Sequence, residues 1–172
     1  MERISVTLEQ TLAAREKRTA RQRELIEKFG QTLLSLTAIA PGPVKRTEET
    51  VFVGETACAL IAEKFGGETV FSEANDAVTG FEAMFVIKTG ADAAKKTALE
   101  IENTHPLGRL MDIDVFDDAG KSVGRGQMGL ESRKCILCQN SAAYCMRAKT
   151  HTPAEIAEKI KKIVADFRQK NK

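Results

Sequence analysis

The hydrophobic pattern between Thr32 and Phe116 constrains the fold most, because it switches repeatedly between the period of strands and the period of helices. Thr32 to Ala40 is a nearly unbroken apolar run that stops at Pro41-Gly42-Pro43, as expected of a central strand. The following segments have, in order, the patterns of a helix, two strands, a helix and a last strand. Their predicted bounds are about 47–65, 68–72, 81–88, 90–103 and 109–116.

This order of strand, helix, strand, strand, helix and strand is typical of the split βαβ arrangement of ferredoxin-like domains. We therefore predict an α+β fold whose sheet is mixed or antiparallel, with helices packed mainly on one face. A nucleotidyltransferase-like mixed sheet would give a similar pattern, because periodicity does not fix the strand order. It stays open as the alternative.

Length and composition favour a single domain. With 172 residues, of which 42% are hydrophobic, the chain can close one core. Within this single domain over 1–172 we expect an N-terminal helix or arm over 1–30, which is mostly polar. We also expect a Cys-rich loop and a C-terminal helix that is capped at Thr152.

The start of the chain and its charge argue against several classes of protein. Residues 1–10 carry charged and polar side chains throughout, and no run reaches the roughly 18 apolar residues of a membrane span. We therefore expect a cytoplasmic protein with no signal peptide and no membrane partner. The formal net charge of +2 is small for a nucleic-acid binder, so we expect no nucleic-acid partner.

Positive charge is concentrated in the segment 124–152, which also holds most of the cysteines. Glu131 is its single acidic residue, so the segment has a larger positive excess than the whole chain. Its basic residues are Arg125, Arg133, Lys134, Arg147 and Lys149. Such residues can bind an anionic ligand, although a run of charge is more often a solvated surface.

A pair of carboxylates lies in the last predicted strand. Alternation places Asp112 and Asp114 on one face, with Cα atoms about 7 Å apart, so that both can bind one hard cation such as Mg²⁺. A solvated outer sheet face is the alternative. The neighbours favour a site, because Arg109 suits phosphate and Gly108 permits a close backbone approach. With His105 just before them, these residues predict phosphoryl or nucleotidyl transfer.

A second group of residues has the ligand types and spacing of a closed tetrahedral zinc site. Its members are Cys135, Cys138, Cys145 and His151. Zinc would fold a loop that has few apolar residues. A redox-active CxxC pair is disfavoured, because no strand precedes Cys135, and reduced structural thiols are the other alternative. The local clustering agrees with a reducing cytosol.

Four segments of the chain also resemble motifs found in a known protein family. They are Arg15-Glu16-Lys17-Arg18, Ala40 to Lys45, His105 to Val115, and the segment from Cys135 through Cys138, Cys145, Arg147 and Lys149 to His151. In these segments the chain resembles the citrate lyase phosphoribosyl-dephospho-coenzyme A transferase family. The third and fourth are long and specific, and their order and separation resemble the family's. One departure is Met111, where the family leads us to expect a bulkier aromatic residue.

The resemblance implies that 2'-(5''-triphosphoribosyl)-3'-dephospho-coenzyme A donates its nucleotidyl part to a serine of the acyl carrier protein, the gamma subunit, of citrate lyase, releasing pyrophosphate. Mg²⁺ on Asp112 and Asp114, together with Arg109, would act on the triphosphate. His105 is a candidate base, with either aspartate as the alternative. The residues expected to bind substrate are Arg15, Arg18, Lys45, Gly108, Arg125, Arg133, Arg147 and Lys149.

Two other functions stay open at this point. An analogous transferase for malonate decarboxylase would use a similar donor on a different carrier. A non-catalytic zinc-knuckle adaptor would use 124–152 to bind an acidic partner such as a carrier protein or RNA. The paired aspartates disfavour the adaptor, as does the scarcity of aromatic residues for base stacking, with Tyr144 alone near the cysteines.

Overall fold

Four strands form one antiparallel sheet in the structure, a computed structural model that describes residues 3–171. The strands are β1 (Thr32–Ala38), β2 (Thr69–Ala77), β3 (Gly80–Ile87) and β4 (Met111–Phe116), in the order β2-β3-β1-β4. Each neighbouring pair is antiparallel. The predicted α+β class is confirmed. Of the two sheet types left open, residues 3–171 form the antiparallel one, so the mixed-sheet alternative does not describe them.

The helices found within the described residues are α1 (Leu8–Phe29), α2 (Glu48–Phe65), α3 (Ala91–Thr104), α4 (Ala142–Ala148) and α5 (Pro153–Lys170). Helices α1, α2 and α5 begin at threonines whose side chains accept a hydrogen bond from a backbone N–H of the first turn. These caps are Thr7, Thr47 and Thr152. No helix in this part of the chain combines the length and the apolar content needed to cross a membrane.

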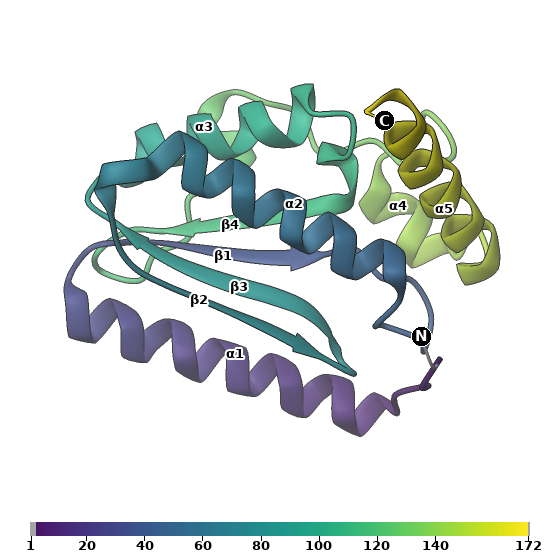
Figure 1. The fold of residues 1–172 in the computed structure, drawn as a ribbon, viewed down its shortest axis with the longest axis horizontal. Coiled ribbons are helices and arrows are strands. Elements are labelled where there is room, and N and C mark those ends of the chain that lie inside the picture. Colours follow the sequence, from purple (N-terminus) through teal and green to yellow (C-terminus); the bar gives the residue numbers. More distant parts are fainter. Residues whose placement is uncertain (1–2, 172) are drawn as a thin grey trace.

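The main core lies between the sheet and the helices α2 and α3 (Figure 1). Alternate strand residues such as Leu34, Leu36 and Ile113 point into it and are at most 1% exposed. The helices contribute apolar residues at helical spacing. They are Val53, Ala57 and Ile61 of α2, Ala94 and Ala98 of α3, and Ile160 and Val164 of α5.

Helix α1 covers the opposite face of the sheet (Figure 1). Its buried residues gather near its end, where Leu25 and Ile26 pack against Leu33, Met84 and Val86. Leu25 is only 1% exposed. The segment is therefore a docked helix rather than a flexible arm. Helices thus cover both faces of the sheet, and the prediction of helices mainly on one face does not anticipate α1, because the polar composition of 1–30 conceals its docking.

Polar contacts continue the docking of α1 toward its N-terminus. Gln22 Nε2 donates to Ser35 Oγ of β1 at 2.9 Å. Arg21 forms a two-pronged ion pair with Glu73 of β2, with both N···O distances at 2.8 Å. The face beneath α1 therefore has an apolar half and a polar half.

We predict that Leu25→Ala lowers the free energy of unfolding by about 2–5 kcal/mol, because it leaves a cavity between α1 and the sheet. Leu12→Ala is the control on the same helix. Leu12 is 47% exposed, and its truncation should change stability by about 0.5 kcal/mol or less. Urea denaturation measures both variants, and equal stabilities would show that the docking of α1 contributes little.

Candidate active site

Asp112 and Asp114 lie on the α1 face of β4, away from the main core. The residues that alternate with them, Met111, Ile113 and Val115, are at most 1% exposed on the core side. Strand β4 is at an edge of the sheet, because β1 is its sole strand neighbour among the described residues. The two carboxylates therefore lie side by side at an accessible sheet edge, on one face as the alternation predicts.

A surface pocket of about 530 Å³ opens beside the two aspartates. Helix α3 and the segment that follows β4 form the rest of its lining. The charged lining residues are Lys95, Glu102, Asp112, Asp114, Arg125 and Arg133. The pocket thus offers carboxylates, which suit a hard cation, beside guanidinium groups, which suit phosphate.

The surroundings of the carboxylates differ. Asp112 Oδ1 lies 3.4 Å from Nη1 of Arg133. Much of Asp114 stays in contact with solvent, but partial desolvation of its carboxyl raises its pKa above the ordinary value. The charge of Asp112 adds to this rise, and the charge of Lys95 opposes it. The ionised form of Asp114 is therefore disfavoured, and a bound cation would relieve this.

Two arginines of 124–152, Arg125 and Arg133, line one side of the pocket, and Arg109 lies near them without lining it. Arg125 and Arg133 both form ion pairs with Glu102 of α3. Arg109 donates a hydrogen bond to the backbone carbonyl of Lys134. Burial lowers the pKa of Arg109, and the charges of Arg133 and Arg125 lower it further. The charged residues that line the whole pocket balance, with three basic and three acidic side chains. On this side, however, three guanidinium groups lie near the one carboxylate of Glu102, which favours an anionic ligand.

Helix α1 brings Arg18 to the same sheet face. Arg18 Nη1 lies 3.1 Å from Glu82 Oε2. The strand register places Thr37 of β1 between Glu82 of β3 and Asp112 of β4. Because directly paired residues of antiparallel strands share a face, Arg18 and the aspartates border one polar surface.

The loop after β1 brings Lys45 to the same end of the sheet. Lys45 lies beside Gly80, where β3 begins, since a Cβ added to Gly80 would be 3.7 Å from Lys45 Cβ. Its Nζ donates to the carbonyl of Ala40 at 2.9 Å. Burial lowers the pKa of Lys45, and the nearby charge of Arg15 adds to the effect. Arg15, Arg18 and Lys45 therefore gather at the polar half of the α1 face.

His105 and Gly108 are not brought to the aspartates. The ring of His105 packs on Phe167, with centroids 5.2 Å apart, and its Nδ1 accepts the N–H of Leu107 at 3.1 Å. Burial lowers the pKa of His105. A Cβ at Gly108 would lie 2.5 Å from the carbonyl oxygen of Glu102. Gly108 thus allows the turn before β4 to pack closely against the end of α3, instead of allowing a ligand to approach.

Arg147 and Lys149 also lie outside the aspartate pocket. Arg147 is in the last turn of α4, and Lys149 is its C-cap in the left-handed conformation, with φ of 49°. Both side chains are exposed, and neither lines the pocket. The structure therefore separates Arg125 and Arg133, which line the pocket, from Arg147 and Lys149, which are exposed on and after α4.

The predicted cysteine and histidine cluster is assembled in the structure. The ligand atoms of Cys135, Cys138, Cys145 and His151 all lie within 4.8 Å of one another. Cys138 Sγ is 3.4 Å from Cys145 Sγ and 3.3 Å from His151 Nε2. Burial, followed by the neighbouring thiols of Cys138 and Cys135, raises the pKa of Cys145 to about 11. This donor set and its closeness fit a tetrahedral zinc site.

The cysteine loop also carries Arg133. The N–H of Cys135 donates to the carbonyl of Asn140, and the N–H of Ala142 donates to the carbonyl of Arg133, both at 2.7 Å. These bonds close the loop that contains Cys138. The position of Arg133 beside Asp112 therefore depends on the fold of the cluster.

Sequence reasoning missed Lys95 and Glu102, which are 5% and 3% exposed. Both lie on α3, among the buried residues Ala94, Ala98 and Ile101. Lys and Glu are almost never fully buried unless they are paired. The sequence does contain a signal for this pair, because Lys95 and Glu102 directly adjoin the buried apolar residues Ala94 and Ile101 of the helix before the aspartate strand.

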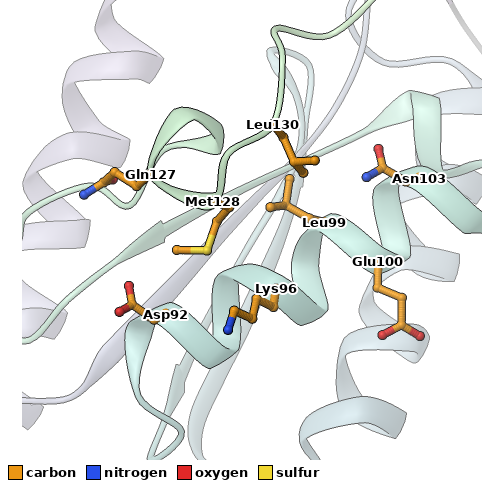
Figure 2. A pocket seen from close by; sticks show the side chains of 8 residues that line it. All are labelled: Asp92, Lys96, Leu99, Glu100, Asn103, Gln127, Met128 and Leu130. Atoms are coloured by element: carbon orange, nitrogen blue, oxygen red, sulfur yellow. The ribbon is translucent and has the colours of Figure 1, made fainter.

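A second groove, of about 560 Å³, lies between α3 and the turn at Gln127 (Figure 2). Leu99, Met128 and Leu130 line it together with polar residues. Leu130 also lines the aspartate pocket, so this turn contributes to both hollows. Lys96 is the single basic residue of the groove lining, which makes the aspartate pocket the better site for an anion.

The chain is similar to known proteins over nearly its whole length. Residues 6–167 match the family model described as apo-citrate lyase phosphoribosyl-dephospho-CoA transferase. Proteins of that name from Shigella boydii serotype 18, Escherichia coli strain SE11 and Escherichia coli O157:H7 are each 35% identical to it over 165 residues. The alignments cover 94% of this chain and 90% of each relative.

We predict that Asp114→Asn melts at the same temperature as the parent protein or slightly higher at neutral pH. The raised pKa means that folding disfavours the ionised carboxyl, so ionised Asp114 lowers stability above its folded-state pKa. The gain should vanish as the pH falls through this pKa, because the parent carboxyl then becomes neutral too.

Thermal unfolding between about pH 3 and pH 8 measures this effect across the range in which an aspartate titrates. Asp118→Asn makes the same change at an exposed turn position and is the control. A clear loss of stability in Asp114→Asn at neutral pH would contradict the account of its surroundings.

Proposed function

The chain belongs to the apo-citrate lyase phosphoribosyl-dephospho-CoA transferase family, and from this premise we propose that it attaches the phosphoribosyl-dephospho-coenzyme A group to a serine of the citrate lyase carrier protein. The donor is 2'-(5''-triphosphoribosyl)-3'-dephospho-coenzyme A. The observation that carries the proposal is the pair Asp112 and Asp114 in a pocket rich in arginine. Such a pocket suits a triphosphate.

The reaction is a nucleotidyl transfer. The serine Oγ attacks the α-phosphorus of the donor's triphosphate, and a new P–O bond forms to the serine. The bond between the α-phosphorus and the oxygen that bridges to the β-phosphate breaks, and pyrophosphate leaves with that electron pair. The serine proton passes to a base of the enzyme. Atoms and charge balance without an oxidant or a reductant.

The chain's own residues take distinct roles in this proposal. Asp112 and Asp114 would hold Mg²⁺, which neutralises phosphate charge when it is bound. Arg133 binds phosphate oxygens beside the aspartates, and the nearby charge of Arg109 adds to the attraction. The serine proton passes to a carboxylate oxygen of Asp112 or Asp114 that does not hold the cation, because the ring of His105 is packed on Phe167.

Residues on the α1 side bind the remainder of the donor. Three basic residues border the polar surface on the side of α1, opposite the aspartate pocket; they are Arg15, Arg18 and Lys45. A long anionic donor can therefore extend from the aspartate pocket to these residues. Arg125 lines the aspartate pocket and joins the phosphate-binding set. Arg147 and Lys149 are exposed beyond the pocket, where they are better placed to meet the carrier protein than the donor.

We also propose that Cys135, Cys138, Cys145 and His151 bind one zinc ion. The closeness of three thiols and an imidazole supports this, and zinc supplies structural cross-linking at such a site instead of chemistry on the substrate. Its effect on transfer is indirect, because the same loop holds Arg133.

We further infer that the sheet has the ferredoxin-like topology and that the protein acts in the cytoplasm. The strand order β2-β3-β1-β4, with α2 between β1 and β2 and α3 between β3 and β4, supports the topology. The unpaired state of all four cysteines supports a reducing compartment. In this topology the aspartate strand is at the sheet edge, open to a large substrate.

The direct test is to incubate the protein with Mg²⁺, the donor and an apo-carrier protein, and to read the carrier by intact mass. The carrier of citrate lyase should gain the mass of one phosphoribosyl-dephospho-coenzyme A group. The carrier of malonate decarboxylase should stay unmodified, and a gain on that carrier alone would favour the analogous transferase. Binding of the citrate lyase carrier with no gain in mass would favour a non-catalytic adaptor.

In the same assay, Asp112→Asn and Asp114→Asn should each lower the turnover by about 100-fold or more, because a neutral amide no longer holds the cation at the triphosphate. Circular dichroism should show an unchanged fold. Asp118→Asn, which changes the same charge at an exposed turn, should retain activity. Near-normal turnover of both pocket variants would remove the aspartates from the active site.

Protein purified without added zinc should contain about one zinc per chain, as a closed four-ligand site binds one ion. Cys138→Ser should lose the metal, and hydrogen exchange should then increase in 124–152 but not in the sheet. Cys58→Ser is the control, because Cys58 packs against the main core from α2. Metal-free protein whose thiols all react freely would rule out the zinc site.

A further inference from the structure

A buried pair of charges fastens α3 to the exposed edge of β4. Ile113 is in the middle of β4, and its N–H donates to Glu102 Oε1 at 2.9 Å. Its carbonyl accepts from Lys95 Nζ at 3.1 Å. Edge strands leave backbone groups without a strand partner, and these two side chains satisfy the groups of one residue. Glu102 is therefore fixed relative to the aspartates on either side of Ile113.

The same carboxylate holds two arginines. Glu102 Oε2 lies 3.0 Å from Nη1 of Arg125, and Glu102 Oε1 contacts Nη2 of Arg133. Arg125 also donates to Asn103 Oδ1 at 3.2 Å. The other end of the Arg133 guanidinium reaches Asp112 at 3.4 Å. A chain of contacts thus runs from the strand backbone through Glu102 to both arginines and back to an aspartate.

The balance of charge around Glu102 differs from that of a simple structural ion pair. The carboxylate of Glu102 pairs with two guanidinium groups, those of Arg125 and Arg133. Arg109 lies close enough that the charges of these two arginines lower its pKa. Once a cation occupies the aspartates, this group of arginines keeps an excess of positive charge. Guanidinium groups held by a buried carboxylate present their remaining N–H donors in a fixed direction, which suits phosphate oxygens.

We infer that Glu102 is a positioning residue that holds Arg125 and Arg133 as a clamp for the leaving pyrophosphate end of the donor. This inference rests on the proposed nucleotidyl transfer. The clamp lies next to Asp112 and Asp114, so the α-phosphorus at the aspartates and the two outer phosphates at the arginines are neighbours. The arginines stabilise the negative charge that develops on pyrophosphate as its bond to the α-phosphorus breaks.

The test is Glu102→Gln, which keeps an acceptor for the Ile113 N–H but removes the charge that orients the arginines. Turnover should fall by about 10- to 100-fold, because the donors no longer point where the charge develops. The KM for the donor should change by about threefold or less, since both arginines remain and attract the anion. The dissociation constant of Mg²⁺-pyrophosphate, measured by calorimetry, should also change by about threefold or less. Glu100→Gln, at an exposed position of the same helix, should change neither.

Two further variants keep the test decisive if Glu102→Gln folds poorly. Arg133→Lys keeps the charge but loses the planar fork that joins Glu102 to Asp112, and it should show the same loss of turnover with pyrophosphate binding retained. Arg125→Gln combined with Arg133→Gln should weaken pyrophosphate binding by about tenfold or more.

The outcomes separate the clamp from the proposed function. Full turnover in Glu102→Gln and in Arg133→Lys, or unchanged pyrophosphate binding in the double variant, would overturn the clamp while the transferase stands. A parent protein that modifies no carrier, yet binds pyrophosphate through Arg125 and Arg133, would overturn the function and leave the site as a phosphate clamp. A parent protein that does neither overturns both.

Discussion

The alternation of side chains along β4 is the constraint on which the rest of the structure depends. Met111, Ile113 and Val115 seal the main core, and the same strand therefore presents Asp112 and Asp114 to the other face. A register shift of one residue would bury both carboxylates and expose the core residues. Core packing thus enforces the geometry of the candidate site, while α1 and the segment 124–152 approach that face from two sides.

Several features were predictable because they depend on short-range patterns. The switch between the two hydrophobic periods gives the order of strands and helices, and alternation alone places Asp112 and Asp114 together. The spacing within 135–151 brings four zinc-type ligands together in one short segment, which local chain geometry permits. The antiparallel pairing of the sheet required the structure, because periodicity does not determine which strands are neighbours.

Other features depend on contacts between distant elements and could not be derived from the sequence pattern. His105 is close to the aspartates in sequence, but the end of α3 turns its ring toward Phe167 of α5. The docking of α1 depends on an apolar patch built from separate strands, which the polar composition of 1–30 conceals. Glu102 resembles an ordinary surface residue of α3 until the edge of β4 and two arginines of 124–152 are placed around it.

In the proposed reaction, the donor's triphosphate reacts in the pocket beside Asp112 and Asp114. A crystal structure of the protein with Mg²⁺ and a donor analogue that carries a methylene group between the α- and β-phosphorus atoms tests this most directly. We expect the metal on the two aspartates and the outer phosphates against Arg133 and Arg125. A triphosphate bound elsewhere, for example in the groove between α3 and the turn at Gln127, with no metal at the aspartates, would contradict the account.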